Sequence, residues 1–162
     1  MIKPFKYGEI DGVKNFSNSQ IMSIWDKIVE EGKEDYVNRI AKDWTREDFL
    51  KSVKSNKFDF WIFIDGKRLF GVVWVIIKGK RAELHWCTFK GFKNIIKHGK
   101  WITSFIMDFY KLDVLYGFTP GNNKLALKYL DKIGWSKGGI LPMGSYSYKE
   151  NKSTSAILMF RS

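Results

Sequence analysis

Residues 58–89 read FDFWIFIDGKRLFGVVWVIIKGKRAELHWCTF, and this stretch decides the fold class. It is dense in β-branched and aromatic residues, which favour strands, and only Asp65-Gly66 and Lys78-Gly79-Lys80 interrupt it. Both interruptions have the composition of hairpin turns. The stretch therefore predicts an antiparallel meander with strands at about residues 58–64, 69–77 and 81–88.

The segment after the meander predicts a parallel crossover. A basic connector comes first, at residues 90–100. Apolar residues then return at helical spacing, namely Ile102, Phe105, Ile106 and Phe109. Residues 113–118 follow as a short buried strand. A strand, a helix and a second strand in this order imply two parallel strands joined by the helix.

The C-terminal part of the chain predicts one more helix and a closing hairpin. Asn122 or Asn123 caps the helix, and Gly134 ends it. The apolar face of this helix consists of Ala126, Tyr129, Leu130 and Ile133. Residues 144–149 and 155–160 then predict the hairpin.

Two helices are predicted before the meander, and each begins with a capping box. Ser17 and Gln20 open the first helix. Thr45 and Asp48 open the second, which runs to about residue 55. The first helix ends at Gly32. Its apolar stripe consists of Ile21, Ile24, Trp25, Ile28 and Val29.

Together these elements predict one α/β (α+β) domain over residues 1–162, with a mixed, mostly antiparallel sheet flanked by helices. No internal repeat and no linker divides the sequence. A chain of 162 residues with 44% hydrophobic residues is long enough to bury a sizeable core.

Composition limits the classes of protein that the chain can belong to. Cys87 is the single cysteine, which excludes an internal disulfide and favours a reducing compartment. No spacing of cysteines and histidines fits a zinc site, so no metal is expected.

The N-terminus lacks the apolar core of a signal peptide, and no apolar run reaches the ~20 residues that span a bilayer. We therefore expect a cytoplasmic protein without a membrane partner. The net charge of +11 favours anionic partners, such as nucleic acid, acidic surfaces or a phosphate-rich cofactor. A solvated lysine-rich surface is the alternative.

A segment near the C-terminus carries a family resemblance. Residues 121–135 read GNNKLALKYLDKIGW. They resemble the Asn-x-x-Ala segment of the GNAT N-acetyltransferase superfamily, which is followed eight residues later by Gly and an aromatic residue. Asn123, Ala126, Gly134 and Trp135 stand at these positions, and the predicted order of elements is also similar to that of GNAT proteins. Residues 116–123, 134–139 and 159–161 look like GNAT-like proteins of tailed bacteriophages, which implies the host cytoplasm or the virion as the location.

The resemblance implies acetyl-coenzyme A as co-substrate, lying between the strands at 81–88 and 113–118. The usual Arg/Gln-x-x-Gly-x-Gly/Ala motif of the crossover helix is not recognisable, since Gly99 stands at its first glycine and Trp101 at its second. Free N–H groups at a helix start attract phosphate. Lysines and a histidine add positive charge there, namely Lys93, Lys97, His98 and Lys100. The alternatives are a solvated loop and a crossover helix that begins at a slightly different point. The cofactor-binding residues expected from the resemblance are Cys87, Thr88, Phe89, Lys97, His98, Gly99, Lys100 and Asn123.

GNAT proteins commonly place a carboxylate base on the strand before the crossover helix. Glu83, His85 and Cys87 alternate along residues 81–88 and therefore share one face of the strand. Glu83 and His85 are the candidate bases, acting directly or through a water. A surface ion pair for Glu83 and a hydrogen-bonded ring for His85 are the structural alternatives. Cys87 is expected to be a small buried hydrophobe.

Many GNAT enzymes use a tyrosine to protonate the departing thiolate. The family spacing places this residue at Leu130, and Tyr129 is the candidate one position earlier. A packing role at the edge of the core is the alternative for Tyr129. Weaker candidates on the final hairpin are Tyr146 and Tyr148.

The leading functional expectation is an acetyl-CoA-dependent N-acetyltransferase that acetylates a primary amine, as a monomer or a homodimer. In GNAT proteins the first two helices and the final hairpin usually form the acceptor pocket. Here they offer aromatic residues that do not select an acceptor, namely Trp25, Tyr36, Trp44 and Tyr146. The second expectation is a GNAT-fold protein without catalysis that serves as a binding or virion-associated component. The third is a nucleic-acid-binding protein, which the charge favours but no recognised motif supports.

Overall fold

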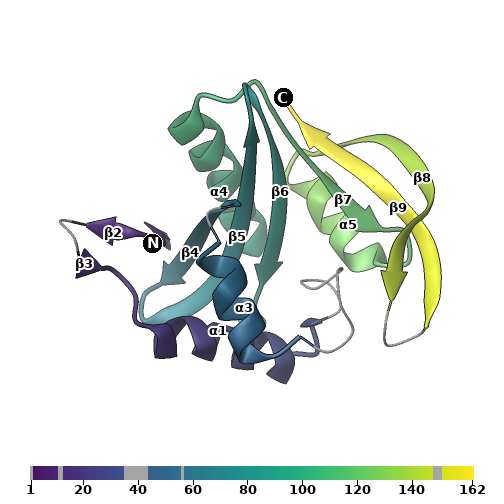
Figure 1. Ribbon diagram of the computed structural model, residues 1–162. Coiled ribbons are helices and arrows are strands. Elements are labelled where there is room, and N and C mark those ends of the chain that lie inside the picture. The colour runs from purple at the N-terminus through teal and green to yellow at the C-terminus, as the bar shows by residue number, and fades with distance from the viewer. Residues whose placement is uncertain (1, 11–12, 35–43, 56, 148–150) are drawn as a thin grey trace. The chain divides into compact units, whose positions relative to one another are not determined.

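A computed structural model describes residues 2–10, 13–34, 44–55, 57–147 and 151–162, and the described residues form a mixed seven-stranded sheet with helices (Figure 1). The strand order in this sheet is β1-β4-β5-β6-β7-β9-β8. A separate two-stranded ribbon joins β2 (Glu9–Ile10) to β3 (Val13–Lys14). The predicted α+β class with a mixed, mostly antiparallel sheet is confirmed.

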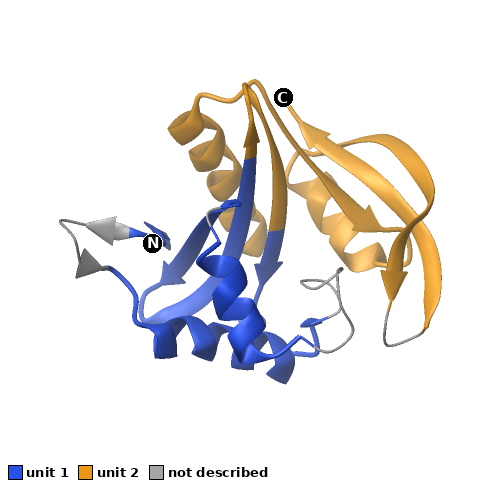
Figure 2. Cartoon of the chain, viewed as in Figure 1, with its two compact units in different colours: residues 1–76, 86–91 blue, residues 77–85, 92–162 orange. Residues whose placement is uncertain are grey.

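The chain consists of two compact units (Figure 2). The first comprises residues 1–76 and 86–91, and the second comprises residues 77–85 and 92–162. The boundary falls within β5 (Arg68–Lys78) and β6 (Arg81–Thr88).

The first unit contains the strands β1 (Ile2–Lys6) and β4 (Asp59–Asp65) and most of β5. β4 pairs antiparallel with β5, as the hairpin turn at Asp65-Gly66 predicted. β1 pairs antiparallel with β4 and was not predicted from the sequence. Pro4 and two lysines hide the strand pattern in this short stretch, and such residues are typical of a sheet edge.

Two helices of the first unit begin at the predicted capping boxes. Ser17 caps α1 (Asn18–Glu30), and Thr45 caps α3 (Arg46–Val53). The predicted stripe of α1 is buried except at Val29, which is 46% exposed, so that prediction was wrong at one position. Phe49 of α3 is fully buried and lies in an aromatic cluster of the unit's core. Its ring neighbours in this cluster are Trp25, Phe60 and Trp74.

The second unit contains α4 (Ile95–Tyr110), and this helix begins earlier than the sequence indicated. Residues 90–100 were predicted to be a connector, but residues 95–100 are helical. The buried side of the helix includes Gly99 and Thr103 together with Ile102 and Ile106. Small residues on this side concealed the first turns, and Phe109, predicted to be in the stripe, is 52% exposed. None of the described helices is both long and apolar enough to cross a membrane.

The predicted parallel crossover is confirmed, because β6 pairs in parallel with β7 (Val114–Pro120). Glu83 lies opposite Tyr116 in this register. α5 (Lys124–Lys132) follows, with Asn123 as its cap and Gly134 in the left-handed conformation after its end.

The closing hairpin is longer than predicted. Its strands are β8 (Ser136–Ser147) and β9 (Lys152–Arg161), and β9 also pairs antiparallel with β7. Glycines and Pro142 in β8, together with two register shifts against β9, explain why the first part of β8 did not read as a strand.

The close approach of β6 and β7 requires a glycine at position 117, next to the paired residues Glu83 and Tyr116. A Cβ atom built on Gly117 would lie 2.7 Å from the carbonyl oxygen of Leu84, which is backbone and cannot move aside cheaply. We expect Gly117→Ala to lower the free energy of unfolding by about 2 kcal/mol, measured by urea denaturation. Gly139→Ala is the matched control, since its Cβ would meet no atom of the described chain within 4 Å. Equal effects of the two variants would contradict this explanation.

Candidate active site

A chain of hydrogen-bonded side chains joins four residues of the second unit that lie on three strands. His85 Nε2 lies 2.9 Å from Glu83 Oε1, and Lys78 Nζ donates to Glu83 Oε2 at 3.2 Å. Lys78 Nζ also donates to the hydroxyl oxygen of Tyr116 at 3.0 Å. The strands β5, β6 and β7 each contribute, so the parallel register of β6 and β7 assembles the group. We call these four residues the polar chain.

The polar chain is partly open to solvent. The Glu83 side chain is 18% exposed, that of His85 36% and that of Lys78 54%. Hydrogen bonding to the Tyr116 hydroxyl, and then to the Glu83 carboxylate, raises the pKa of Lys78 above its ordinary value. Lys78 is therefore a permanent cation, and Glu83 lies between it and the imidazole of His85.

The N-terminus of α4 presents backbone N–H groups and positive charge. Asn94 adopts a left-handed conformation with φ of 58°, and within the described chain its side chain makes no capping hydrogen bond. The first helical hydrogen bond runs from the N–H of His98 to the carbonyl of Asn94 at 3.0 Å. Lys97 and Lys100 are exposed in the first two turns. Such a helix start has the chemistry to bind an anionic group.

Gly99 and Tyr129 pack against each other between α4 and α5. A Cβ on Gly99 would lie 2.2 Å from the Tyr129 hydroxyl and 2.9 Å from Ile133 Cγ2. The Tyr129 hydroxyl donates to the carbonyl oxygen of Ile95 at 3.3 Å. Burial raises the pKa of Tyr129, so the phenol keeps its proton at neutral pH. The missing side chain of Gly99 leaves the room that this ring occupies.

Asn123 uses its side chain for the structure of α5. Its carboxamide oxygen accepts a hydrogen bond from the backbone N–H of Ala126 at 3.1 Å. The asparagine and alanine of the quoted segment therefore contact each other at the start of this helix.

The predicted cofactor residues at the end of β6 and directly after it belong to the first unit. Cys87 is buried, and desolvation raises the pKa of its thiol to about 11, which fits a small hydrophobe and not a nucleophile. The carbonyl of Thr88 accepts a hydrogen bond from Lys33 Nζ. Phe89 is buried, and the ammonium groups of Lys27 and Lys33 lie 5.5 and 5.6 Å from its ring centre.

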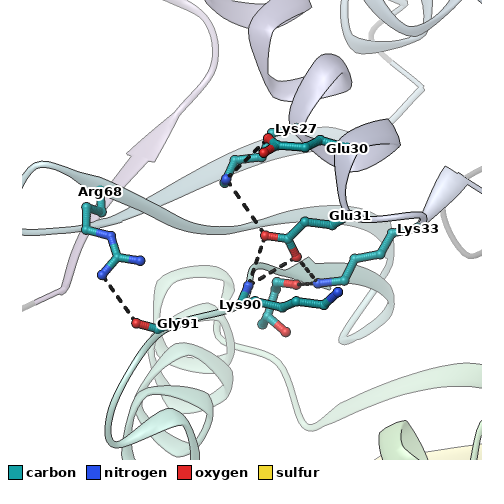
Figure 3. Close-up of polar contacts among 8 residues, drawn as sticks. Lys27, Glu30, Glu31, Lys33, Arg68, Lys90 and Gly91 are labelled. Carbon is teal, nitrogen blue, oxygen red and sulfur yellow. Dashed lines mark hydrogen bonds and ion pairs between the residues drawn. The ribbon is translucent and has the colours of Figure 1, made fainter.

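A carboxylate in the first unit ties the end of α1 to the segment after β6 (Figure 3). Glu31 accepts hydrogen bonds from Lys33 Nζ at 2.6 Å and from the backbone N–H of Lys90 at 3.1 Å to each oxygen. Burial opposes ionisation of this carboxyl, but the bonds from Lys33 and Lys90 outweigh it and lower the pKa of Glu31. The ionised form of Glu31 is therefore part of the folded structure.

We expect Glu31→Gln to lower the free energy of unfolding by about 1–2 kcal/mol at pH 7. The pKa of Glu31 is lower in the folded than in the unfolded chain. Its contribution is therefore present above the unfolded pKa and is lost as the pH falls through the folded value. Denaturation at pH 7 and below pH ~4 measures this, with Glu30→Gln as the control because that side chain is 75% exposed. A loss that does not depend on pH would contradict the assignment.

The predicted acceptor aromatics divide between the units. Trp25 and Trp44 lie in the first unit, with ring centres 6.1 Å apart. Tyr146 lies on β8 and donates to Asn151 Oδ1 at 2.5 Å. Tyr36 and Tyr148 lie outside the described residues.

No family model matches the sequence, and no curated protein sequence matches it. The structure resembles spermidine N-acetyltransferase from Vibrio cholerae, solved in complex with CoA and spermine, with a TM-score of 0.77 and 12% identity. That likeness covers 99% of this chain and 94% of the other. Ribosomal-protein-S5-alanine acetyltransferase from Vibrio fischeri matches with a TM-score of 0.68 and 13% identity, over 90% of this chain and 89% of the other.

The chain has the GNAT fold. Within this fold β6 is the strand before the crossover helix, and it carries Glu83 and His85 as the sequence predicted. Identities of 12% and 13% support the fold and leave the activity to be argued from the residues.

Lys78 and Tyr116 are members of the polar chain that sequence reasoning missed. The sequence indicated only a hairpin turn at Lys78 and, at Tyr116, only the start of the segment 116–123 that resembles phage GNAT-like proteins. The register of β6 with β7 brings Tyr116 opposite Glu83, and a parallel register cannot be counted from the sequence.

Arg161 was also missed as a link between β9 and α4. Its guanidinium donates to the hydroxyl of Thr103 and, at 2.9 Å, to that of Ser104. Thr103 is fully buried, so this contact holds the C-terminal end of the GNAT fold against the middle of the crossover helix.

Proposed function

We propose that this chain is an acetyl-CoA-dependent N-acetyltransferase that transfers an acetyl group to a primary amine. The observation that carries the proposal is the GNAT fold, which matches an acetyltransferase over 99% of the chain with a TM-score of 0.77. Residues 1–162 are proposed to act as one acetyltransferase domain. A bacteriophage origin and a cytoplasmic or virion location stay predictions from the sequence.

The proposed phosphate site is the start of α4. Support comes from the left-handed Asn94, the backbone N–H groups that precede His98, and the exposed Lys97 and Lys100. Backbone donors and the positive end of the helix dipole stabilise phosphate charge. Gly99 lies in the same turns of the helix. The further residues proposed for cofactor binding are Cys87, Thr88, Phe89 and Asn123.

The proposed chemistry needs a base for the acceptor and a proton for the leaving thiolate. The acceptor ammonium loses one proton to the base, its nitrogen bonds to the acetyl carbon, and the bond from that carbon to sulfur breaks. The nitrogen loses its second proton as the amide forms, and this proton balances the one that the thiolate gains. Glu83 or His85 is proposed to accept the proton from the amine, directly or through a water. Tyr129 is proposed to protonate the thiolate, and its raised pKa keeps the proton on the phenol at neutral pH.

An acetyl-transfer assay tests the proposal. The full chain is incubated with acetyl-CoA and separate amine acceptors: a polyamine, a peptide with a free N-terminus, a lysine peptide and an aminoglycoside. Thiol release and the mass of each acceptor are measured. Acetylation of one class above the uncatalysed rate supports the proposal. No transfer to any acceptor, with intact folded protein, contradicts it.

A second candidate function is a GNAT-fold binding protein without catalysis. The packing of Gly99 favours it, because the ring of Tyr129 occupies the space beside this glycine and its hydroxyl donates to the carbonyl of Ile95. A large residue, Trp101, follows two positions later. Binding of acetyl-CoA without transfer to any amine distinguishes this candidate from the enzyme.

A further inference from the structure

The polar chain contains two groups that can accept a proton, and their contacts differ. Both oxygens of Glu83 are engaged, Oε1 with His85 Nε2 at 2.9 Å and Oε2 with Lys78 Nζ at 3.2 Å. We propose that His85 is the residue that takes the proton from the acceptor amine, and that Glu83 and Lys78 are positioning residues for its ring. This inference rests on the proposed acetyl transfer.

The chemistry of the ring favours His85 over Glu83. When Nε2 carries the proton that Glu83 accepts, Nδ1 carries the lone pair and is the basic atom. A base works best when its ordinary pKa is near the working pH, which holds for imidazole and not for a carboxylate. His85 is also more open, with 36% of its side chain exposed against 18% for Glu83.

Proton balance assigns a distinct role to each member. The acceptor ammonium loses its first proton to Nδ1, which gives an imidazolium whose charge the adjacent Glu83 carboxylate offsets. The second proton, lost as the amide forms, replaces the one that Tyr129 gives to the thiolate. Lys78 stays protonated throughout, because both of its hydrogen-bond partners raise its pKa. Lys78 is therefore not a proton carrier.

Lys78 links the Glu83 carboxylate to Tyr116 on the neighbouring strand. Its ammonium bridges Glu83 on β6 and the hydroxyl of Tyr116 on β7, 3.0 Å away, and these two residues lie opposite each other in the register. Without Lys78 the Glu83 carboxylate loses one hydrogen bond and one ion pair. Among the described residues, His85 is then its remaining ion-pair partner. The charged and titratable groups that surround His85 in the polar chain are Glu83, Lys78 and Tyr116.

The measurement is an NMR titration of the imidazole groups in the full-length chain. The chain has two histidines, so His98→Gln assigns the signal of His85. Glu83→Gln removes a negative charge and is expected to lower the titration midpoint of His85 by roughly 0.5–1 pH unit. Lys78→Met removes a positive charge and is expected to raise it by a similar amount. Lys80→Met is the matched control, since this lysine is exposed on the same turn, and it should leave the midpoint unchanged.

Opposite shifts in the two variants support the inference, and absent shifts or shifts in the same direction overturn it. The pH profile of acetyl transfer then tests the role of His85. In an active enzyme, the pH at which kcat/KM falls on the acid side should shift with the NMR titration midpoint of His85 in each variant. A pH profile that does not shift with this midpoint overturns the inference. Absence of transfer in the wild-type chain overturns the proposed function instead, while the titration still reports whether the polar chain exists.

Discussion

Replacing either member of the Glu83–His85 pair should abolish most acetyl transfer. At saturating acetyl-CoA we expect Glu83→Gln and His85→Gln each to lower kcat by roughly 10²-fold or more, the range for loss of a general base. The two side chains are 2.9 Å apart and act on one proton, so the double variant should be no slower than the worse single variant.

The control for this pair is Asp131→Asn, an exposed acid on α5 that undergoes the same type of change. Thermal unfolding of each variant checks that the fold is kept, because the pair is only partly buried and its loss should cost little stability. Additive losses in the double variant, or activity within threefold of wild type in either single variant, would contradict the assignment of the pair.

Charge reversal at the start of α4 should weaken binding of acetyl-CoA. We expect Lys97→Glu and Lys100→Glu each to raise Kd by about tenfold at low salt, because each variant replaces an attraction to phosphate with a repulsion. Both side chains are exposed, so the effect should shrink as salt rises toward 0.5 M.

Lys137→Glu is the matched control for these variants, since it makes the same change of charge at an exposed position on β8. It should leave Kd near the wild-type value. An equal loss in Lys137→Glu would mean that acetyl-CoA responds to the net charge of +11 and not to the start of α4.

Local signals in the sequence predicted most of the fold. Both capping boxes formed, because the side chains that make them are three residues apart and need no distant partner. The glycine turns of the meander also act locally, as does the Asn123 cap of α5. These signals placed Glu83 and His85 on the strand before the crossover helix.

Features that depend on distant partners were missed. β1 is a strand because β4 pairs with it, although its own sequence contains Pro4. Tyr116 joins the polar chain because of a parallel register, and Lys78 because its long side chain reaches across two strands. The start of α4 was placed too late, since Gly99 and Thr103 fill buried positions without apolar bulk.

Calorimetric titration of the wild-type chain with acetyl-CoA, run beside coenzyme A, tests the central claim most directly. The proposed enzyme must bind this co-substrate before any acceptor can react. We predict saturable binding with a micromolar Kd, together with a rise in Tm that grows with ligand concentration. Absence of heat and of any Tm shift at millimolar acetyl-CoA would contradict the acetyltransferase account and leave a GNAT-fold protein with another role.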